Sequence, residues 1–258
     1  MAPTERLVRR PAVSRRERPA KPALTRDGIV TAAMAVMTAE GLDKVTMRRL
    51  AQELDTGPAS LYVYVRNTAE LHAAMLEELL AAVDLSPVTA AGDWAGRLVA
   101  VLWSYTSILF DHPGLAQSAL VTRPSGPASL RLADGILALL SAGQVAPDRA
   151  AWGVDILLHF ATATAAEQGT RQRALDAPDQ EAAAAAALRA APADAYPHIA
   201  ALGADELLSG WGPDRLTWGL TVLINGIRDT PRPGPGRAPG PGPVTYPVTG
   251  PGSGPVTG

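Results

Sequence analysis

The chain has 258 residues, 47% of them hydrophobic, which suffices for one large globular domain or two modest ones, and no apolar run is long enough to cross a bilayer. It has no cysteine, which excludes disulfides, thiolate metal sites and cysteine nucleophiles. The net charge of −2 is unevenly divided: residues 1–66 hold 12 Lys and Arg against 7 Asp and Glu (+5), whereas residues 67–258 hold 11 against 18 (−7). A basic N-terminal part indicates a polyanionic partner, and we expect a cytoplasmic protein.

The N-terminal residues predict an arm followed by a helix. Residues 1–23 contain several Pro and Arg residues without helical periodicity, so we expect a disordered basic arm. Thr25 then fits the N-cap of a helix with Asp27 in its first turn, where a carboxylate suits the positive end of the helix dipole. Gly41 is expected to end this helix.

Three further helix starts follow. Thr46 begins a second helix, with Val45 and Leu50 placed as a hydrophobic staple. After a turn at residues 55–57, Pro58 fits the first position of a third helix. Asn67, with Glu70 three residues later, resembles a capping box for a long helix that reaches about residue 83.

The third of these helices has a composition that also suits a strand. Leu61 to Val65 alternates aliphatic and aromatic residues, but no second strand-like run lies near enough to pair with it. On a helix, Leu61 and Val65 lie one turn apart and face inward. We therefore predict a helix-turn-helix over about residues 46–65.

The remaining elements are also expected to be helical. Apolar residues at helical spacing predict a helix around residues 98–109, ended by "DHPG", another around 130–143, and a last one over 214–228. The stretch 152–166 is apolar nearly all round and should be buried on several sides. We expect residues 168–212 to form a mobile connection with a helical piece. Because Pro and Gly fill 17 of the 28 positions from 231 to 258, we expect residues 230–258 to be a disordered tail.

The first part of the chain resembles a known family. The sequence from Leu24 to about residue 83, with its ordered Thr46-Met47-Arg48, Leu50-Ala51, Ser60-Leu61-Tyr62 and Asn67, is similar to the DNA-binding domain of the TetR family of transcriptional repressors. The resemblance implies an all-α fold, in which residues 24–83 form a three-helix DNA-binding domain and residues 84–229 a larger helical domain for effector binding and dimerisation. Two positions depart from the family: Asp55 stands where glycine is usual, and Thr68 where lysine is frequent.

The resemblance implies a set of DNA contacts. Arg48 matches a family residue that contacts DNA, and its guanidinium suits a guanine edge or a phosphate; the alternative is a solvated surface arginine. Hydroxyl groups on the third helix suit phosphate oxygens, and small residues at its start permit close approach to base edges. Arg49, on the next position of the second helix, is expected to be a solvated or capping charge. The expected DNA-binding residues are Thr46, Arg48, Gly57, Pro58, Ala59, Ser60, Tyr62, Tyr64 and Thr68.

The second part resembles the tetracycline repressor branch. Its pattern of two aromatics, Thr-Arg-Pro and Gly is kept, but the positions that match that repressor's drug and Mg²⁺ contacts are Asp84, Val101, Ala119 and Gly135. At these positions, binding of the drug and Mg²⁺ would need His, Asn, His and Gln. The resemblance therefore implies a pocket, but argues against a tetracycline–Mg²⁺ chelate as its ligand. Aromatics and buried histidines are more often core residues than ligand contacts. The expected lining of an effector pocket is Tyr105, Arg123, Pro124, His159 and Glu167.

The functional interpretation combines these patterns. We predict a homodimeric repressor of a palindromic double-stranded DNA operator, released by a small molecule, with the helix at 152–166 and the last helix pairing between subunits. A second hypothesis is a small-molecule sensor whose DNA-binding domain is vestigial. An enzyme is not expected, because no nucleophile–base pair, phosphate loop or metal cluster is present, and we expect no metal and no cofactor. The basic arm could enter a minor groove or only add nonspecific phosphate attraction.

Overall fold

All regular structure in the described part of the chain is helical. The structure is a computed structural model that describes residues 23–122, 124–173, 177–209 and 213–233, and no strand occurs among them. Except for Ala23 and residues 230–233, the predicted basic arm and Pro/Gly-rich tail lie outside the described residues. The all-α prediction is confirmed. In chain order the helices are α1 Arg26–Glu40, η2 Leu42–Lys44, α2 Met47–Glu53, α3 Pro58–Leu61, α4 Thr68–Leu80, η3 Ser86–Val88, α5 Trp94–Asp111, α6 Pro113–Ala119, α7 Pro127–Ala142, α8 Pro147–Arg173, α9 Ala177–Arg189, α10 Pro197–Leu202, α11 Ala204–Leu208 and α12 Pro213–Asp229.

The N-terminal helices begin where their capping residues predict. The hydroxyl groups of Thr25 and Thr46 accept hydrogen bonds from the backbone N–H groups three residues later, each at 3.1 Å, and Asn67 Oδ1 does the same for Glu70 at 2.8 Å. The expected capping box is wrong in its second half. The Glu70 carboxylate accepts the backbone N–H of Arg66, at 2.9 Å, rather than that of Asn67.

The third helix is shorter than expected. It ends at Leu61, and the chain from Tyr62 to Val65 continues as a turn held by hydrogen bonds to the Leu61 carbonyl. Leu61 and Val65 are nevertheless both fully buried, as predicted. Asp55, in the turn before this helix, has φ +46°, the left-handed conformation that glycine usually supplies. Aspartate adopts this conformation more readily than most residues, so the turn forms without glycine.

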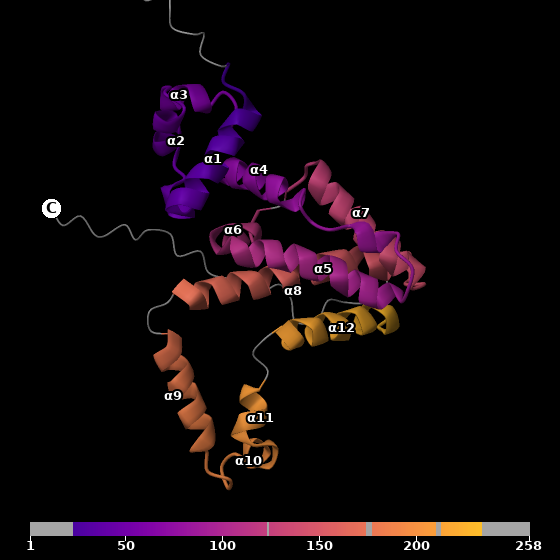
Figure 1. Cartoon of the computed structure of the whole chain (residues 1–258). Helices are drawn as coiled ribbons and strands as arrows, with labels where there is room; N and C mark the ends of the chain where they lie inside the picture. Colours follow the sequence, from indigo (N-terminus) through magenta and orange to yellow (C-terminus); the bar gives the residue numbers. More distant parts are fainter. Residues whose placement is uncertain (1–22, 123, 174–176, 210–212, 234–258) are drawn as a thin grey trace, which may run out of the picture.

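Helix α4 belongs to two hydrophobic cores. Leu71 and Met75 pack in the N-terminal core with α1, α2 and α3, whereas Leu76 and Leu80, further along the same helix, pack in the second core. The second core is formed mainly by α5, α7, α8 and α12 (Figure 1). Leu115 of α6 also reaches the N-terminal core. Helices α4 and α6 therefore join the two cores.

Several elements of the second half differ from expectation. The "DHPG" segment ends α5 but also begins α6, which was not predicted: Pro113 occupies the first turn, where its missing N–H costs nothing. Helix α8 is longer than predicted. It packs closely on α6 because Gly169 has no side chain; a Cβ at this position would overlap the Pro113 ring. The described part of residues 168–212, expected to be a mobile connection with a helical piece, holds more helix than that: the end of α8, then α9, α10 and α11. Figure 1 shows α9, α10 and α11 set apart from α5 and α12. The many alanines of this segment favour helix.

Candidate nucleic-acid interface and ligand pocket

The predicted DNA-binding residues are all exposed. Except for Thr68, the first residue of α4, they lie on or beside α2 and α3, which pack against each other at one end of the molecule, away from α12 (Figure 1). Tyr62 is 51% exposed and Tyr64 38%. The full set that reaches solvent is Thr46, Arg48, Gly57, Pro58, Ala59, Ser60, Tyr62, Tyr64 and Thr68.

The two neighbouring arginines of α2 have different environments. Arg49 forms ion pairs with Glu40 at the end of α1, at 2.6 Å, and with Glu53 on α2, at 2.8 Å. The side-chain hydrogen bond with Arg49 lowers the pKa of the Glu40 carboxyl. Arg49 therefore holds α2 against α1. The sequence predicted only a solvated or capping charge at this position. Arg48 is exposed and makes no ion pair with any described residue.

Two further features of this surface suit contact with DNA. The Thr46 hydroxyl oxygen accepts the helix-capping hydrogen bond from Arg49 N–H, but its own proton remains available to a phosphate oxygen. Val63, just after α3, is 79% exposed. An apolar side chain here suits a thymine methyl group. Helical spacing predicts this exposure, because Val63 lies off the inward face that Leu61 and Val65 share.

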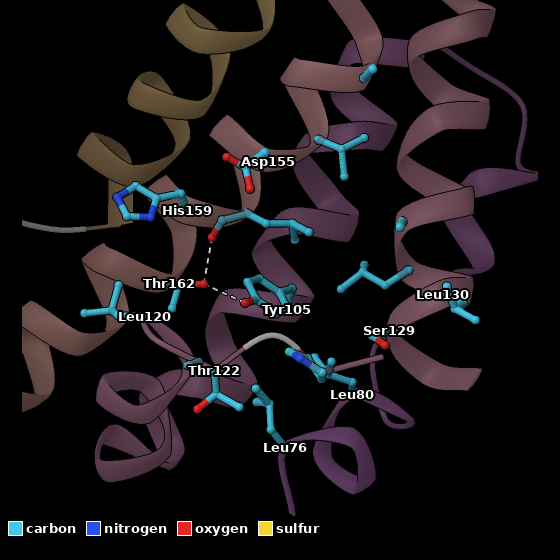
Figure 2. Close-up of a pocket in the computed structure, with 17 residues that line it drawn as sticks. Leu76, Leu80, Tyr105, Leu120, Thr122, Ser129, Leu130, Asp155, His159 and Thr162 are labelled. Atoms are coloured by element: carbon cyan, nitrogen blue, oxygen red, sulfur yellow. Dashed lines mark hydrogen bonds between the residues drawn. The ribbon is translucent and has the colours of Figure 1, made fainter. Parts of the chain in front are cut away.

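A cavity of about 390 Å³ lies in the second half of the chain. Its walls come from α4, α5, α7, α8 and the segment between α6 and α7 (Figure 2). Apolar side chains form most of the lining, as is usual for small-molecule sites. They are Leu76, Leu80, Ala119, Leu120, Pro124, Leu130, Leu132, Ala133, Ala151, Val154 and Leu158.

A few polar groups face this cavity. The Tyr105 hydroxyl lies 2.6 Å from Thr162 Oγ1, which in turn donates to the Leu158 carbonyl at 2.7 Å (Figure 2). Burial raises the pKa of Tyr105, so its hydroxyl stays protonated at neutral pH. Asp155 and His159, one turn apart on α8, also line the cavity. Thr122 and Ser129 complete the polar set.

The cavity includes three of the five predicted effector-binding residues. Tyr105, Pro124 and His159 line it, and Arg123 lies outside the described residues. Glu167 does not line it. Eight residues along α8 place Glu167 about 12 Å from His159, where it is exposed and pairs with Arg171 at 2.7 Å. Thr162 and Ser129 were missed, because the contacts that define them join residues far apart in the sequence.

The positions that match the tetracycline repressor's drug contacts do not form a chelating site. Of the four, only Ala119 lines the cavity. Val101 is fully buried in the core, Gly135 packs against Val88, and Asp84 is exposed, with its carboxylate accepting the Ser86 N–H at 2.9 Å. In the part of the chain that the structure describes, no group of three His, Asp or Glu residues is placed to hold a metal. The cavity therefore suits an apolar ligand.

Two polar contacts connect the cavity wall to α4. His72 Nδ1 lies 3.1 Å from Ser118 Oγ on α6, and Ser118 Oγ lies 3.4 Å from Thr122 Oγ1, which faces the cavity. Further along α4, the Glu77 carboxylate accepts the backbone N–H groups of Ala128 and Ser129 in the first turn of α7. Both ends of the segment between α6 and α7 are thus bound to the helix that leaves the N-terminal core.

An apolar surface remains exposed on α8 and α12. Trp152 and Ile156 of α8 are 49% and 42% exposed, and Trp218 and Val222 of α12 are 69% and 47% exposed. Helix α8 packs on α5, α6, α7 and α12, so the expected burial of residues 152–166 on several sides is confirmed, with Trp152 and Ile156 on its one exposed face. Helices α8 and α12 pack against each other, so these side chains lie on neighbouring helices. Among the described residues, no helix is long and apolar enough to cross a membrane.

Comparisons with known proteins agree with this architecture. Residues 29–75 match the family model "Bacterial regulatory proteins, tetR family", and residues 86–230 match "Tetracyclin repressor-like, C-terminal domain". The chain is 31% identical over 181 residues to an HTH-type transcriptional regulator of Saccharopolyspora erythraea, covering 70% of this chain and 75% of the relative.

Solved structures from Streptomyces coelicolor are also similar. ActR in complex with actinorhodin is 34% identical, with a TM-score of 0.72 over 80% of this chain and 96% of ActR. A protein described as a transcription regulator, SCO7704, is 56% identical, with a TM-score of 0.69 over 83% of this chain and all of that chain.

Proposed function

The chain belongs to the TetR family of bacterial transcriptional regulators, and from this premise we propose that it is a homodimeric repressor that leaves its operator when a small molecule fills the cavity. The observation that carries the proposal is the position of α4. One part of this helix lies in the core of the helix-turn-helix, and the next part forms a wall of the cavity through Leu76 and Leu80. A ligand in the cavity therefore touches the same helix that positions α2 and α3.

The DNA-binding surface supports recognition of duplex DNA in the major groove. Arg48 is exposed beside α3 and is free to bind a guanine edge or a phosphate. Around it, the exposed hydroxyls of Ser60, Tyr62 and Tyr64 suit phosphate oxygens, which fix the register of the helix on DNA. Small residues at the start of α3 allow its backbone to approach the bases.

The exposed apolar surface on α8 and α12 supports a homodimer. Trp152, Ile156, Trp218 and Val222 are large side chains that water solvates poorly. Pairing this surface with its copy across a two-fold axis would produce a four-helix bundle. Two recognition helices about 34–36 Å apart would then read the halves of a palindromic operator, and the protein would act in the cytoplasm, where it meets that DNA.

The proposed release mechanism is a shift between two states. The ligand contacts the segment between α6 and α7, which His72 and Glu77 connect to α4. If the bound ligand changes the position of this segment, α4 and the helix-turn-helix move with it. The separation of the two recognition helices then no longer matches the two halves of the operator. The ligand lowers DNA affinity only as far as it binds the two states differently. ActR, a relative of similar fold, is known with actinorhodin bound, and we propose that this chain also binds a small organic molecule in its cavity.

The vestigial sensor remains the second hypothesis, because Asp55 and Thr68 depart from the family. The observed turn argues against it: Asp55 holds the left-handed conformation that the helix-turn-helix needs, and Thr68 leaves an exposed hydroxyl at the start of α4. Both departures are therefore compatible with DNA binding.

Operator binding tests the proposal. The full chain would be used to select its operator from random duplexes, and fluorescence anisotropy would then be measured on the selected site with unrelated duplex as competitor at several salt concentrations. We expect saturable binding of two chains per site that survives the competitor. Equal binding to all duplexes that disappears with salt would contradict the repressor function and favour the sensor.

The dimer surface is tested separately by sedimentation. Trp218→Arg should convert the dimer to a monomer and abolish operator binding. Leu137→Arg, which also replaces an exposed hydrophobic residue by arginine but on α7, should leave the dimer and operator binding unchanged. A Trp218→Arg protein that remains dimeric would show that the subunits pair elsewhere.

A further inference from the structure

The hydrogen bonds at the base of the cavity define the chemistry of its ligand. We infer that the cavity selects an apolar molecule with a hydroxyl or N–H donor, which donates its hydrogen bond to the Tyr105 phenolic oxygen. This inference rests on the proposed effector function of the cavity and specifies the ligand class for it.

The argument begins with the single proton of Thr162. Its hydroxyl donates to the Leu158 carbonyl, one turn back on α8, at 2.7 Å, as threonines in helices commonly do. A hydroxyl has one proton and two acceptor lone pairs. Thr162 Oγ1 therefore has no proton left for Tyr105, whose hydroxyl lies 2.6 Å away.

The donor in the Tyr105–Thr162 contact must therefore be Tyr105. Its phenol proton points at Thr162 Oγ1, and its oxygen keeps only lone pairs for other partners. Tyr105 lines the cavity and is only 6% exposed, so water reaches this oxygen only through the cavity. A ligand that fills the cavity displaces that water and must supply a donor in its place.

A second hydroxyl in the cavity has the same property. Ser129 Oγ donates to the Gly126 carbonyl at 2.9 Å, so its oxygen also faces the cavity as an acceptor. The Asp155 carboxylate, which lines the cavity about two turns before Thr162 on α8, has further acceptor oxygens. Acceptors thus lie on α5, α7 and α8. A ligand whose polar groups only accept, such as an ether, would leave the Tyr105 oxygen buried without a partner, which costs affinity.

Three fluorescent probes of one shape test the inference. They are 1-pyrenol, which donates and accepts, 1-methoxypyrene, which only accepts, and 1-methylpyrene, which does neither. Their four fused rings occupy less volume than the cavity of about 390 Å³. Binding to the full-length protein is measured by fluorescence at about pH 6.5, well below the ordinary tyrosine pKa of about 10. We expect 1-pyrenol to bind about five- to tenfold more tightly than 1-methoxypyrene.

Substitutions at Thr162 distinguish a hydrogen bond from the ligand to the Tyr105 oxygen from a general preference of the cavity for polar ligands. Thr162→Val removes the acceptor for the Tyr105 proton, which then becomes available to the ligand, so 1-methoxypyrene should bind this variant several-fold more tightly than it binds the wild type. Tyr105→Phe should abolish the preference without tightening 1-methoxypyrene, and Thr162→Ser, which keeps the hydroxyl, should retain the wild-type order. Thr162→Ala frees the same proton and serves if the valine variant unfolds.

The outcomes also separate this inference from the proposed function. Equal affinities of 1-pyrenol and 1-methoxypyrene for the wild type, or no tightening of 1-methoxypyrene in either the Thr162→Val or the Thr162→Ala protein, would overturn it. A clear donor preference in a protein that stays on its operator would uphold the inference and contradict release by ligand. Failure of all three probes to bind would remove the cavity as a ligand site, and with it this inference, while the operator assay still decides DNA binding.

Discussion

The Glu77 carboxylate on α4 accepts a hydrogen bond of 3.2 Å from the backbone N–H of Ser129 in the first turn of α7. Ala128 donates to the same carboxylate, whereas the N-cap residue Gly126 has no side chain to cap the helix. A residue from another helix therefore supplies the negative charge that the N-terminus of α7 favours. This contact joins the helix leaving the DNA-binding region to a helix that lines the cavity.

Glu77→Ala is expected to destabilise the protein by about 1–2 kcal/mol, because two backbone donors at a helix N-terminus lose their acceptor. Glu78→Ala, the same change at the exposed neighbour on α4, should cost less than about 0.5 kcal/mol. Urea unfolding of the two variants measures the difference. Equal costs would show that the capping of α7 by Glu77 contributes little.

His72→Leu should change how stability depends on pH. Burial lowers the pKa of His72 below its ordinary value of 6.5, and its Nε2 atom is buried without a hydrogen-bond partner among the described residues. As the pH falls below about 6.5, the unfolded chain takes up a proton that the folded protein resists, so stability decreases towards acid. Unfolding free energies from pH 7.5 to 5.5 should therefore decrease less in His72→Leu than in the wild type. His198→Leu, at an exposed position on α10, is the control and should follow the wild-type curve.

Arg48 and Arg49 should separate DNA affinity from stability. Arg48→Ala removes an exposed cation that pairs with no acidic residue in the described part of the chain, so operator affinity should decrease by about 1–3 kcal/mol while the unfolding midpoint stays unchanged. If Arg48 binds a phosphate, the salt dependence of binding should also become shallower by about one unit. Arg49→Ala breaks the ion pairs with Glu40 and Glu53 and should lower the unfolding midpoint. Anisotropy titrations and urea melts of both variants check this, and a reversed pattern would show that the two roles are misassigned.

Asp55 should tolerate only residues that accept a left-handed backbone. With φ at +46°, Asp55→Ala is expected to cost about 1 kcal/mol, because alanine keeps the Cβ that crowds the following carbonyl oxygen but loses the short polar side chain that offsets this crowding by local hydrogen bonding. Asp55→Gly and Asp55→Asn should each cost less than Asp55→Ala. Chemical denaturation ranks the three, and an alanine variant as stable as the other two would mean that the turn relaxes without penalty.

Helix starts could be predicted from the sequence because they depend on neighbours. Thr25, Thr46 and Asn67 each cap the backbone N–H three residues later, and a contact of that range is determined by residue type and spacing alone. The same holds for the burial of Leu61 and Val65, which follows from apolar spacing on a short segment. Together with the ordered motif around them, these local signals were sufficient to predict the helix-turn-helix and the all-α class.

The cavity could not be predicted in the same way, because its defining contacts join distant parts of the chain. Tyr105 and Thr162 are 57 residues apart, and Glu77 and Ser129 are 52 apart. No local spacing indicates which hydroxyl meets which, nor which of two positions on one helix, such as His159 and Glu167, faces the cavity. The sequence by itself determined where most helices begin, since capping acts within a turn. Only the tertiary structure decided which hydroxyl groups face the cavity and which helix connects it to the DNA-binding surface, because those relationships depend on how whole helices pack.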